Sequence, residues 1–222
     1  MTNSVRNTAR LIGAGLRALL VLTVVCGVLY PLAVTGVAQA LFPGRANGSE
    51  VRSDGEVVGS ELIGQRYDLP LKKGEETPEP DLKWFQPRPS NGLGINTVNT
   101  RYELFLSGAT NRSGDNAELI RWIEDAKAAV VKDNSTADHK VQPSDVPADA
   151  VTSSASGLDP HISPQYARLQ VHRVAARNSL PVDRVEKLVD AHTDGRVLGF
   201  MGEPRVNVLK LNIALKELIE KD

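Results

Sequence analysis

The longest apolar run in this 222-residue chain lies near its N-terminus, where no charged residue occurs between Arg17 and Arg45. An α-helix needs about 20 mostly apolar residues to cross the hydrocarbon of a bilayer. Residues 18–42 have this length and composition. The pattern therefore predicts one transmembrane helix over residues 18–42, in which Pro31 marks a kink or the approach to the interface.

The residues before this run predict its orientation. Arg6, Arg10 and Arg17 precede it, and residues 1–17 contain no Asp or Glu. Positively charged flanks remain in the cytoplasm, so we expect residues 1–17 to be cytoplasmic and residues 43–222 to be extracytoplasmic. A cleaved secretory signal is the alternative, because Ala38-Gln39-Ala40 has the small-x-small form of a cleavage site. The uncharged run is longer than a signal core of about 7–15 residues, which favours a retained anchor.

Apolar residues at helical spacing predict four further helices after the apolar run. Asp115 with Glu118 has the form of a capping box, Ser163 followed by Pro164 is a typical helix start, and Asn207 is a cap for the last helix. The expected helices are 115–132, 163–178, 182–193 and 207–220.

Short strands are expected in two places. Val51–Gln65 combines β-forming residues with several glycines, which predicts a hairpin or bulged strands, and Arg196–Phe200 is the second candidate. Residues 68–80 are expected to form a charged, exposed loop, and residues 91–111 irregular structure. These elements together predict an α+β fold: one N-terminal transmembrane helix followed by a single extracytoplasmic α+β domain, residues 43–222, with short strands and about four helices.

Composition excludes several classes of function. The only cysteine, Cys26, lies in the predicted span, so the outer domain has neither disulfides nor a cysteine metal site. A net charge of −1, with both signs interspersed, gives no electrostatic reason to bind nucleic acid. The four histidines are far apart in sequence, do not form a His-x-x-x-His pair, and are interpreted as separate surface residues, so no metal is predicted. They are His139, His161, His172 and His192.

The segment 151–164 is the one dense group of polar residues with possible chemistry. Its candidates are Ser154, Ser156, Gly157, Asp159 and His161. Three interpretations are open: a serine nucleophile activated by His161 with Asp159 as its orienter, an anion held by backbone amides at the following helix N-terminus, or caps and turns that only shape the loop.

The nucleophile interpretation is disfavoured by the sequence. No Gly-x-Ser-x-Gly elbow surrounds a serine, and Asp159 and His161 are separated by Pro160, so their side chains are expected to diverge. No glycine-rich phosphate loop is present either. The chain is therefore predicted to have no catalytic site of its own and to act as a subunit of something larger.

A series of short segments stands out by its order and spacing along nearly the whole chain. The most specific runs from Thr152 to Pro164 and into the helix after it, where Gln165, Gln170 and Arg173 lie. The others are Tyr30-Pro31-Leu32, Phe42-Pro43, Asn47-Gly48-Ser49, Gly59–Gln65, Phe85, Arg88-Pro89-Ser90, Ser107–Asn111, Gly202-Glu203-Pro204, Val206-Asn207-Val208 and Leu211-Asn212. Together they resemble the KdpC family, the C subunit of bacterial Kdp potassium-transporting P-type ATPases. The chain departs from the family pattern between Arg66 and Lys83 and at Pro181.

The resemblance implies a non-catalytic accessory subunit that stabilises an ATP-driven potassium uptake complex in the cell membrane. Its implied partners are a potassium-channel-like subunit, an ATP-hydrolysing pump subunit and a small single-span subunit. ATP and K+ are then ligands of the complex, and no cofactor is assigned to this chain.

Family members are also described as catalytic chaperones that raise the ATP affinity of the pump subunit, and the region of Ser156, Gly157 and Gln165 has been compared with the signature motif of ABC transporters. An outer domain cannot touch a cytoplasmic ATP site, so such an effect would pass through the partners. A cap over the potassium entrance is the physically simpler expectation. The alternative is a membrane-tethered exported binding protein or hydrolase that acts alone.

Small residues in the predicted span suggest that it is more than an anchor. Gly27 and Gly36, on either side of Pro31, would allow a neighbouring helix to approach closely. The alternative is the ordinary composition of a membrane helix.

Overall fold

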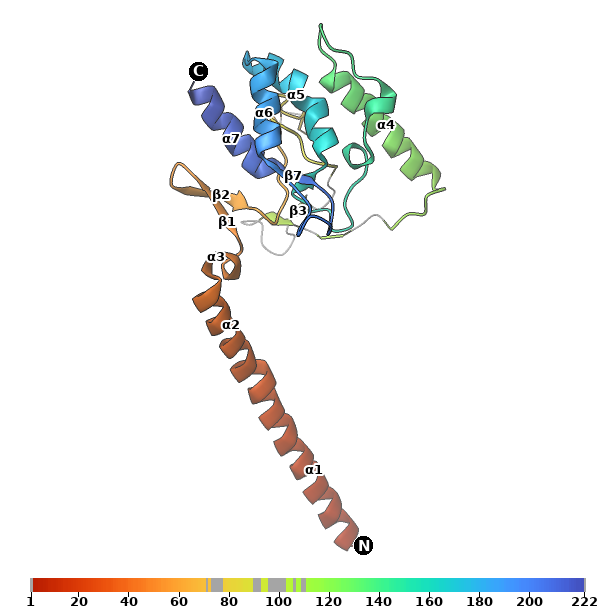
Figure 1. The fold of residues 1–222 in the computed structure, drawn as a ribbon. Coiled ribbons are helices and arrows are strands. Elements are labelled where there is room, and N and C mark those ends of the chain that lie inside the picture. Colours follow the sequence, from red (N-terminus) through yellow and green to blue (C-terminus); the bar gives the residue numbers. More distant parts are fainter. Residues whose placement is uncertain are drawn as a thin grey trace. The chain divides into compact units, whose positions relative to one another are not determined.

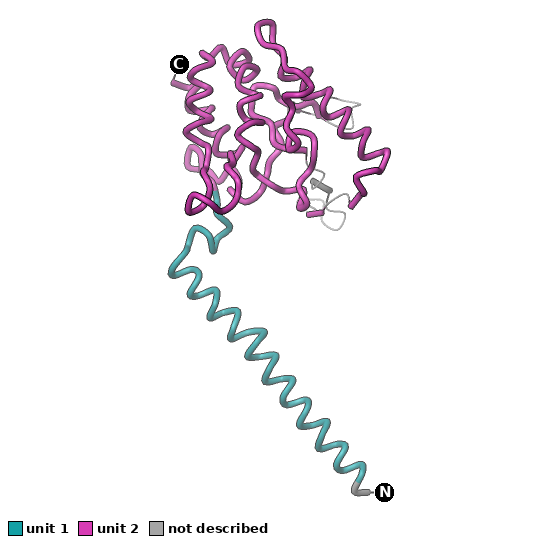
Figure 2. Tube along the Cα trace, turned by 45° about the vertical axis from the view of Figure 1, so that its right-hand side comes forward, with its two compact units in different colours: residues 1–50 teal, residues 51–222 magenta. Residues whose placement is uncertain are grey.

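The structure is a computed structural model that describes residues 2–70, 72, 78–89, 93–95, 103–105, 107–108 and 111–221. It divides into two compact units, residues 1–50 and residues 51–222 (Figure 2).

The first unit confirms the predicted apolar helix. It consists of α1 (Thr2–Val24), a π-helical segment η1 (Val25–Leu29) and α2 (Tyr30–Leu41), followed by the short α3 (Pro43–Ala46). The stretch Ser4–Leu41 is long and apolar enough to cross a membrane, and none of it is buried. A fully exposed apolar helix of this length is a candidate membrane span.

Pro31 changes the hydrogen bonding of this helix without ending it. The Tyr30 N–H donates to the carbonyl of Val25, five residues earlier. Proline has no N–H, and its ring crowds the carbonyl four residues before it, which here belongs to Gly27. A wider π turn before Pro31 gives the ring room while the helix continues.

The second unit has the predicted α+β composition (Figure 1). Its helices, in the part of the chain that the structure describes, are α4 (Ala117–Asn134), α5 (Pro164–Asn178), α6 (Val182–Ala191) and α7 (Val208–Glu220), with 3-10 turns η2 (Pro143–Asp145) and η3 (Ala148–Ala150).

Among the described residues of this unit, the strands are short and form three small sheets. β1 (Glu50–Ser53) pairs with β2 (Glu56–Ser60), and β3 (Leu93–Ile95) pairs antiparallel with β4 (Glu103–Phe105). In the third sheet β7 (Arg205–Asn207) lies between β5 (His161–Ile162) and β6 (Thr193–Asp194), antiparallel to both. His161 is opposite Asn207 in this register.

Two of the three predicted caps are confirmed and one is wrong. The Ser163 hydroxyl accepts from the Tyr166 N–H at 3.0 Å, and the Asn207 side chain accepts from the Lys210 N–H at 3.1 Å. The cap of α4 is Asn116, whose Oδ1 accepts from the N–H groups of Glu118 and Leu119 at 3.1 and 3.0 Å, and not Asp115. Asn116 has the extended backbone of a cap residue, which moves the start of the helix by one residue.

The strand predictions had mixed outcomes. The hairpin in 51–65 is confirmed as β1–β2, joined at Asp54-Gly55, where both φ angles are positive. The strand predicted at Arg196–Phe200 is wrong, because these residues form a tight turn closed by a bridge between Val197 and Met201. Of the stretch 91–111, the described parts include β3 and β4, which corrects the expectation of wholly irregular structure, and the rest lies outside the described residues.

The core is formed by α5, α6, α7 and β7 around one aromatic side chain from an irregular segment. The fully buried residues include Ala167, Val171, Val174, Val185, Val189, Val206, Leu211 and Leu215. Phe85 is packed into this cluster and has 0% exposure. The segment that carries Phe85, residues 81–89, lies outside the helices and named strands.

Two side-chain amides take the place of neighbouring strands for this segment. The Phe85 N–H donates to Asn212 Oδ1 at 2.9 Å, and Asn212 Nδ2 donates back to the Phe85 carbonyl at 2.9 Å. Gln170 makes the same reciprocal pair with the N–H and carbonyl of Gln86, at 2.7 and 3.0 Å. Buried peptide groups require such partners.

Arg173 completes the attachment of this segment. Its side chain is buried and donates to the carbonyls of Leu82 and Trp84, the latter at 3.0 Å, to Asn134 Oδ1 at 2.8 Å and to Gln170 Oε1 at 2.6 Å. Burial lowers the pKa of Arg173 to about 10, so the guanidinium remains charged at neutral pH. The groups that bind it directly are neutral oxygens from three parts of the chain.

We predict that Gln170→Leu destabilises the second unit by about 2–3 kcal/mol, because it leaves buried peptide groups of Gln86 and one Arg173 donor without partners. The matched control is Gln165→Leu, an identical change at an exposed position of the same helix, which should alter stability by less than about 0.5 kcal/mol. Urea unfolding of the full-length chain in detergent, followed by tryptophan fluorescence, measures both. Equal midpoints for the two variants would contradict the structural role of Gln170.

Candidate functional site

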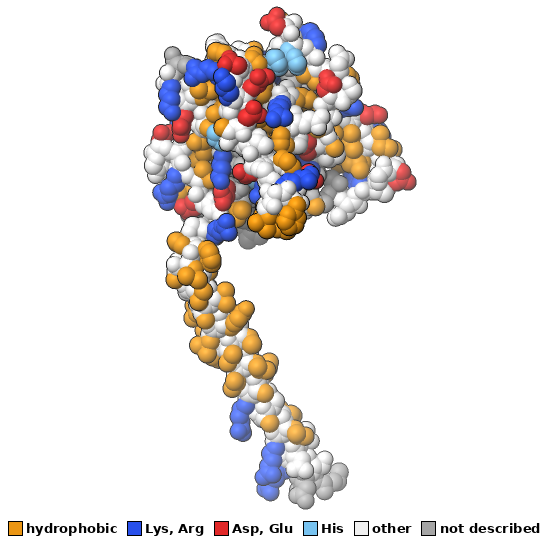
Figure 3. Space-filling model, viewed as in Figure 1, with side chains coloured by type: hydrophobic (Ala, Val, Ile, Leu, Met, Phe, Trp, Pro, Cys, Tyr) orange, Lys and Arg blue, Asp and Glu red, His pale blue; other side chains and the backbone are white. Residues whose placement is uncertain are grey.

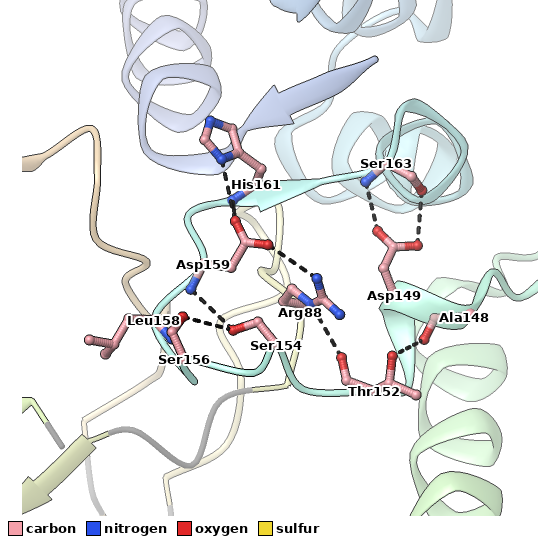
Figure 4. A network of polar contacts seen from close by, with 10 residues as sticks. All are labelled: Arg88, Ala148, Asp149, Thr152, Ser154, Ser156, Leu158, Asp159, His161 and Ser163. Atoms are coloured by element: carbon pink, nitrogen blue, oxygen red, sulfur yellow. Dashed lines mark hydrogen bonds and ion pairs between the residues drawn. The ribbon is translucent and has the colours of Figure 1, made fainter. Parts of the chain in front are cut away.

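The polar segment 151–164 begins after η3 and ends at the start of α5 (Figure 4). Its C-terminal end is fixed by Ser163, whose N–H and hydroxyl both donate to the carboxylate of Asp149, at 2.6 and 2.9 Å. The same hydroxyl caps α5. Because a carboxylate of the chain itself lies at this helix start, the position that an external anion would occupy is filled.

The two candidate serines shape the turn between them. Their hydroxyls are 3.2 Å apart. Ser156 Oγ accepts from the Leu158 N–H at 3.1 Å, and Ser154 Oγ accepts from the Asp159 N–H at 3.4 Å. Gly157 is buried with a φ of 69°, a conformation that glycine adopts without strain. The serines therefore act here as turn-forming residues.

The segment that follows β2 packs against this loop and is hydrogen-bonded to it. The Gly64 N–H donates to the Leu158 carbonyl at 2.8 Å. A Cβ atom at Gly64 would lie 2.7 Å from the Asp159 carbonyl oxygen, closer than real contacts allow. Glycine at position 64 is thus required for the two segments to approach each other.

Asp159 is the centre of the charged interactions in this site. Its Oδ2 pairs with Arg88 Nη1 at 3.1 Å, and its Oδ1 accepts from the His161 N–H at 2.9 Å and lies 3.3 Å from His161 Nδ1. The hydrogen bond from the His161 ring, with smaller contributions from the His161 N–H and Arg88, lowers the pKa of Asp159 to about 2 against the opposing effect of burial. Arg88 Nε also reaches the Thr152 carbonyl at 3.3 Å.

The expectation that Asp159 and His161 diverge is wrong. The Asp159 carboxylate folds over Pro160 to accept the backbone N–H of His161, an Asx-type turn that brings the imidazole to the same oxygen. In Figure 4 the His161 ring lies on the opposite side of Asp159 from Ser154 and Ser156. Among the described contacts, no serine hydroxyl is bonded to His161, so an Asp–His pair exists without a nucleophile beside it.

The remaining candidates do not join this cluster. Gln165 is exposed on the first turn of α5, whereas Gln170 and Arg173 belong to the buried network that holds residues 82–86. Sequence reasoning missed Arg88 and Asp149 as members of the site. Arg88 is 71 residues from Asp159, and no spacing rule connects positions so far apart; only the family resemblance included it.

The histidines are not all separate, which corrects another expectation. The rings of His139 and His172 stack with their centroids 3.8 Å apart and an interplanar angle of 5°. Burial, and secondarily the charge that His139 would carry, lower the pKa of His172. Within the described ranges, no three His, Cys, Asp or Glu side chains are arranged to hold a metal ion.

We predict that Asp159→Asn destabilises the chain at neutral pH and that the difference from wild type shrinks as the pH falls from about 4 to about 2. The folded-state pKa of about 2 lies below the ordinary value of 3.8, so the stabilisation is present above 3.8 and is lost as the folded carboxylate is protonated. Partial exposure reduces the effect to about 1 kcal/mol. Urea midpoints at a series of pH values measure it, with Asp138→Asn in an exposed loop as control. A pH-independent difference would contradict the ion cluster.

Comparison with known proteins identifies the family. The family model described as "KdpC: K+-transporting ATPase, c chain" matches residues 12–217. The chain is 78% identical over 219 residues to a potassium-transporting ATPase KdpC subunit of Streptomyces avermitilis, with 99% of both chains covered. It is 73% identical to that of Streptomyces coelicolor, covering 99% and 97% of the two chains, and 46% identical to that of Caldanaerobacter subterraneus, covering 91% and 92%. The chain therefore belongs to the KdpC family, the c chain of K+-transporting ATPases.

Proposed function

We propose that this chain is a non-catalytic accessory subunit that holds together the other subunits of a potassium-transporting ATPase at the outer face of the membrane. In this proposal residues 18–42 span the bilayer, residues 1–17 remain in the cytoplasm and residues 43–222 form an outer cap near the potassium entrance. The partners are a channel-like subunit, an ATP-hydrolysing pump subunit and a small single-span subunit.

One observation carries this proposal: the polar side chains of the loop 151–164 are bonded to one another and to neighbouring residues. The Ser154, Ser156 and Asp159 side chains bind the loop itself, Arg88 and His161. Such a loop suits docking against another protein, because little conformational freedom remains to be lost on binding. Catalysis by a serine would instead require a hydroxyl within hydrogen-bond reach of a base.

An effect on the ATP affinity of the pump subunit is compatible with this location only as long-range coupling. If the domain lies outside, it cannot contact a cytoplasmic nucleotide. Any change in ATP affinity must then arise because the chain favours one conformation of its partners. By reciprocity, ATP binding at the pump would change the affinity of the complex for this chain by the same factor.

We predict that a chain truncated after residue 44, which retains the predicted span, lowers the recovery of the intact complex and weakens the apparent potassium affinity of uptake. Membrane insertion of the truncated chain, checked by an N-terminal tag, is the control. An intact complex with unchanged potassium affinity would refute the role of cap. A full-length chain that purifies from mildly solubilised membranes without larger multi-span proteins would instead support a tethered protein that acts alone.

We predict that Gly36→Leu lowers the recovery of the complex several-fold. A Cβ at Gly36 meets nothing within 4 Å in this chain, and Gly36 and Ala40 are four residues apart, so they form one small-residue face of α2. Any loss must then come from a neighbouring helix that packs there. The matched control is Val37→Leu, a neighbouring position that already carries a branched side chain. Equal recovery of both variants would exclude close packing at Gly36.

A further inference from the structure

The turn between β6 and β7, residues 195–204, exposes four large apolar side chains. Val197, Leu198, Phe200 and Met201 have exposures of 56%, 76%, 71% and 46%, and those of Leu198 and Phe200 are the highest of any large apolar side chain that the structure describes in the second unit. Figure 3 shows an orange patch at the lower edge of this unit, where this turn lies. Four such side chains within five residues form a contiguous apolar tip, which on a soluble surface signals an interaction site.

The backbone of this tip is closed by its own hydrogen bonds. Val197 and Met201 exchange both N–H···O bonds, at 2.9 and 3.0 Å, and the Phe200 N–H donates to the Val197 carbonyl at 3.3 Å. Leu198 has a φ of 54°, a conformation that costs a non-glycine residue about 1 kcal/mol or more and that the turn imposes. The paired N–H groups of Val197, Phe200 and Met201 lower the cost of placing this part of the backbone in a medium with little water.

Charged residues lie at the base of the turn and not at its tip. Arg196 pairs with Glu203 at 3.3 Å, and Arg205, the first residue of β7, is exposed. The exposed Arg205 suits the level of phosphate headgroups, because its guanidinium can bind phosphate while the tip reaches the acyl region, whereas Arg196 already has a carboxylate partner in Glu203.

The turn lies at the end of the second unit where the chain enters it. Figure 1 shows the blue turn that leads into β7 at the lower end of this unit, the same end as β1. Only residues 42–49 connect α2 with β1, and a fully extended link of this length spans at most about 30 Å. If α2 crosses a bilayer, β1 therefore remains within that distance of its surface, whatever the orientation of the two units.

We propose that the tip formed by Val197, Leu198, Phe200 and Met201 inserts into the headgroup layer of the same membrane and contacts phospholipid directly. Four observations fit a lipid surface: the exposed apolar side chains, the hydrogen bonds that close the turn, the exposed Arg205 at its base and the short link to the predicted span. The inference rests on the membrane anchoring proposed above and is independent of the role in assembly. Lipid contact at this tip would fix the tilt of the outer domain over the membrane.

The test places one fluorescent probe on the tip of the full-length chain. In a Cys26→Ser background, Phe200→Cys is labelled with an environment-sensitive dye, and the protein is reconstituted in nanodiscs of phosphatidylcholine and phosphatidylglycerol, alone and assembled with its partner subunits. The matched control carries the same dye at Asp138→Cys, an exposed position in the loop after α4. Lipids with a spin label high on the acyl chain should quench the dye at position 200 at least two-fold more than at position 138, and aqueous iodide should show the opposite order.

Two results would overturn the proposal. Equal lipid quenching at both positions, with iodide reaching position 200, would show that the tip lies in water. Protection from both quenchers in the assembled complex would show that a partner protein covers the tip. Resistance of the labelled chain to alkaline extraction, measured in parallel, reports whether the span itself is inserted, so failure of the anchor is distinguished from failure of the tip to meet lipid.

Discussion

Residues 82–88 lie against the core without strand partners, with Phe85 fully buried, and the rest of the second unit depends on how the peptide groups of this segment are satisfied. A buried N–H or carbonyl without a partner costs about 1–3 kcal/mol. Gln170 and Asn212 each bind one residue of the segment reciprocally, and Arg173 binds two of its carbonyls. Three polar side chains from α5 and α7 thus supply the hydrogen bonds that a neighbouring strand would otherwise make. These bonds hold Phe85 in the core.

The same attachment positions the candidate site. Arg88 follows directly after the residues that Gln170 and Asn212 hold, and it reaches Asp159 and the Thr152 carbonyl. Arg88 is thus one of several attachments of the polar loop, beside the bond from Gly64 to Leu158 and the pairing of β5 with β7. A change in the buried amides would be transmitted to Arg88, and hence to the surface that we propose the partners recognise.

The two units differ in how the polar groups of their backbones are hydrogen-bonded. In the apolar helix the peptide groups bond within the helix apart from its ends, and the π turn before Pro31 lets the helix continue past a residue that has no N–H. In the second unit, by contrast, irregular segments are stabilised by side chains, and the charged Asp159 cluster stays partly exposed. Membership of the KdpC family fits a chain that combines a candidate membrane span with a polar α+β unit.

The sequence by itself determined the apolar helix, the β1–β2 hairpin and the caps at Ser163 and Asn207, because each depends on residues within a few positions of one another. The sequence analysis was wrong at Asp115, because the neighbouring Asn116 is the cap of α4. It was also wrong at residues 196–200, which form a turn and not a strand. The pairing of Asp159 with His161 is also local, because it follows from an Asx-type turn over Pro160, and the sequence analysis missed it. Only the tertiary structure decided that Arg88 meets Asp159 and that His139 stacks on His172. These contacts require distant segments to be fixed against each other by the core, and that packing leaves no periodic trace in the sequence.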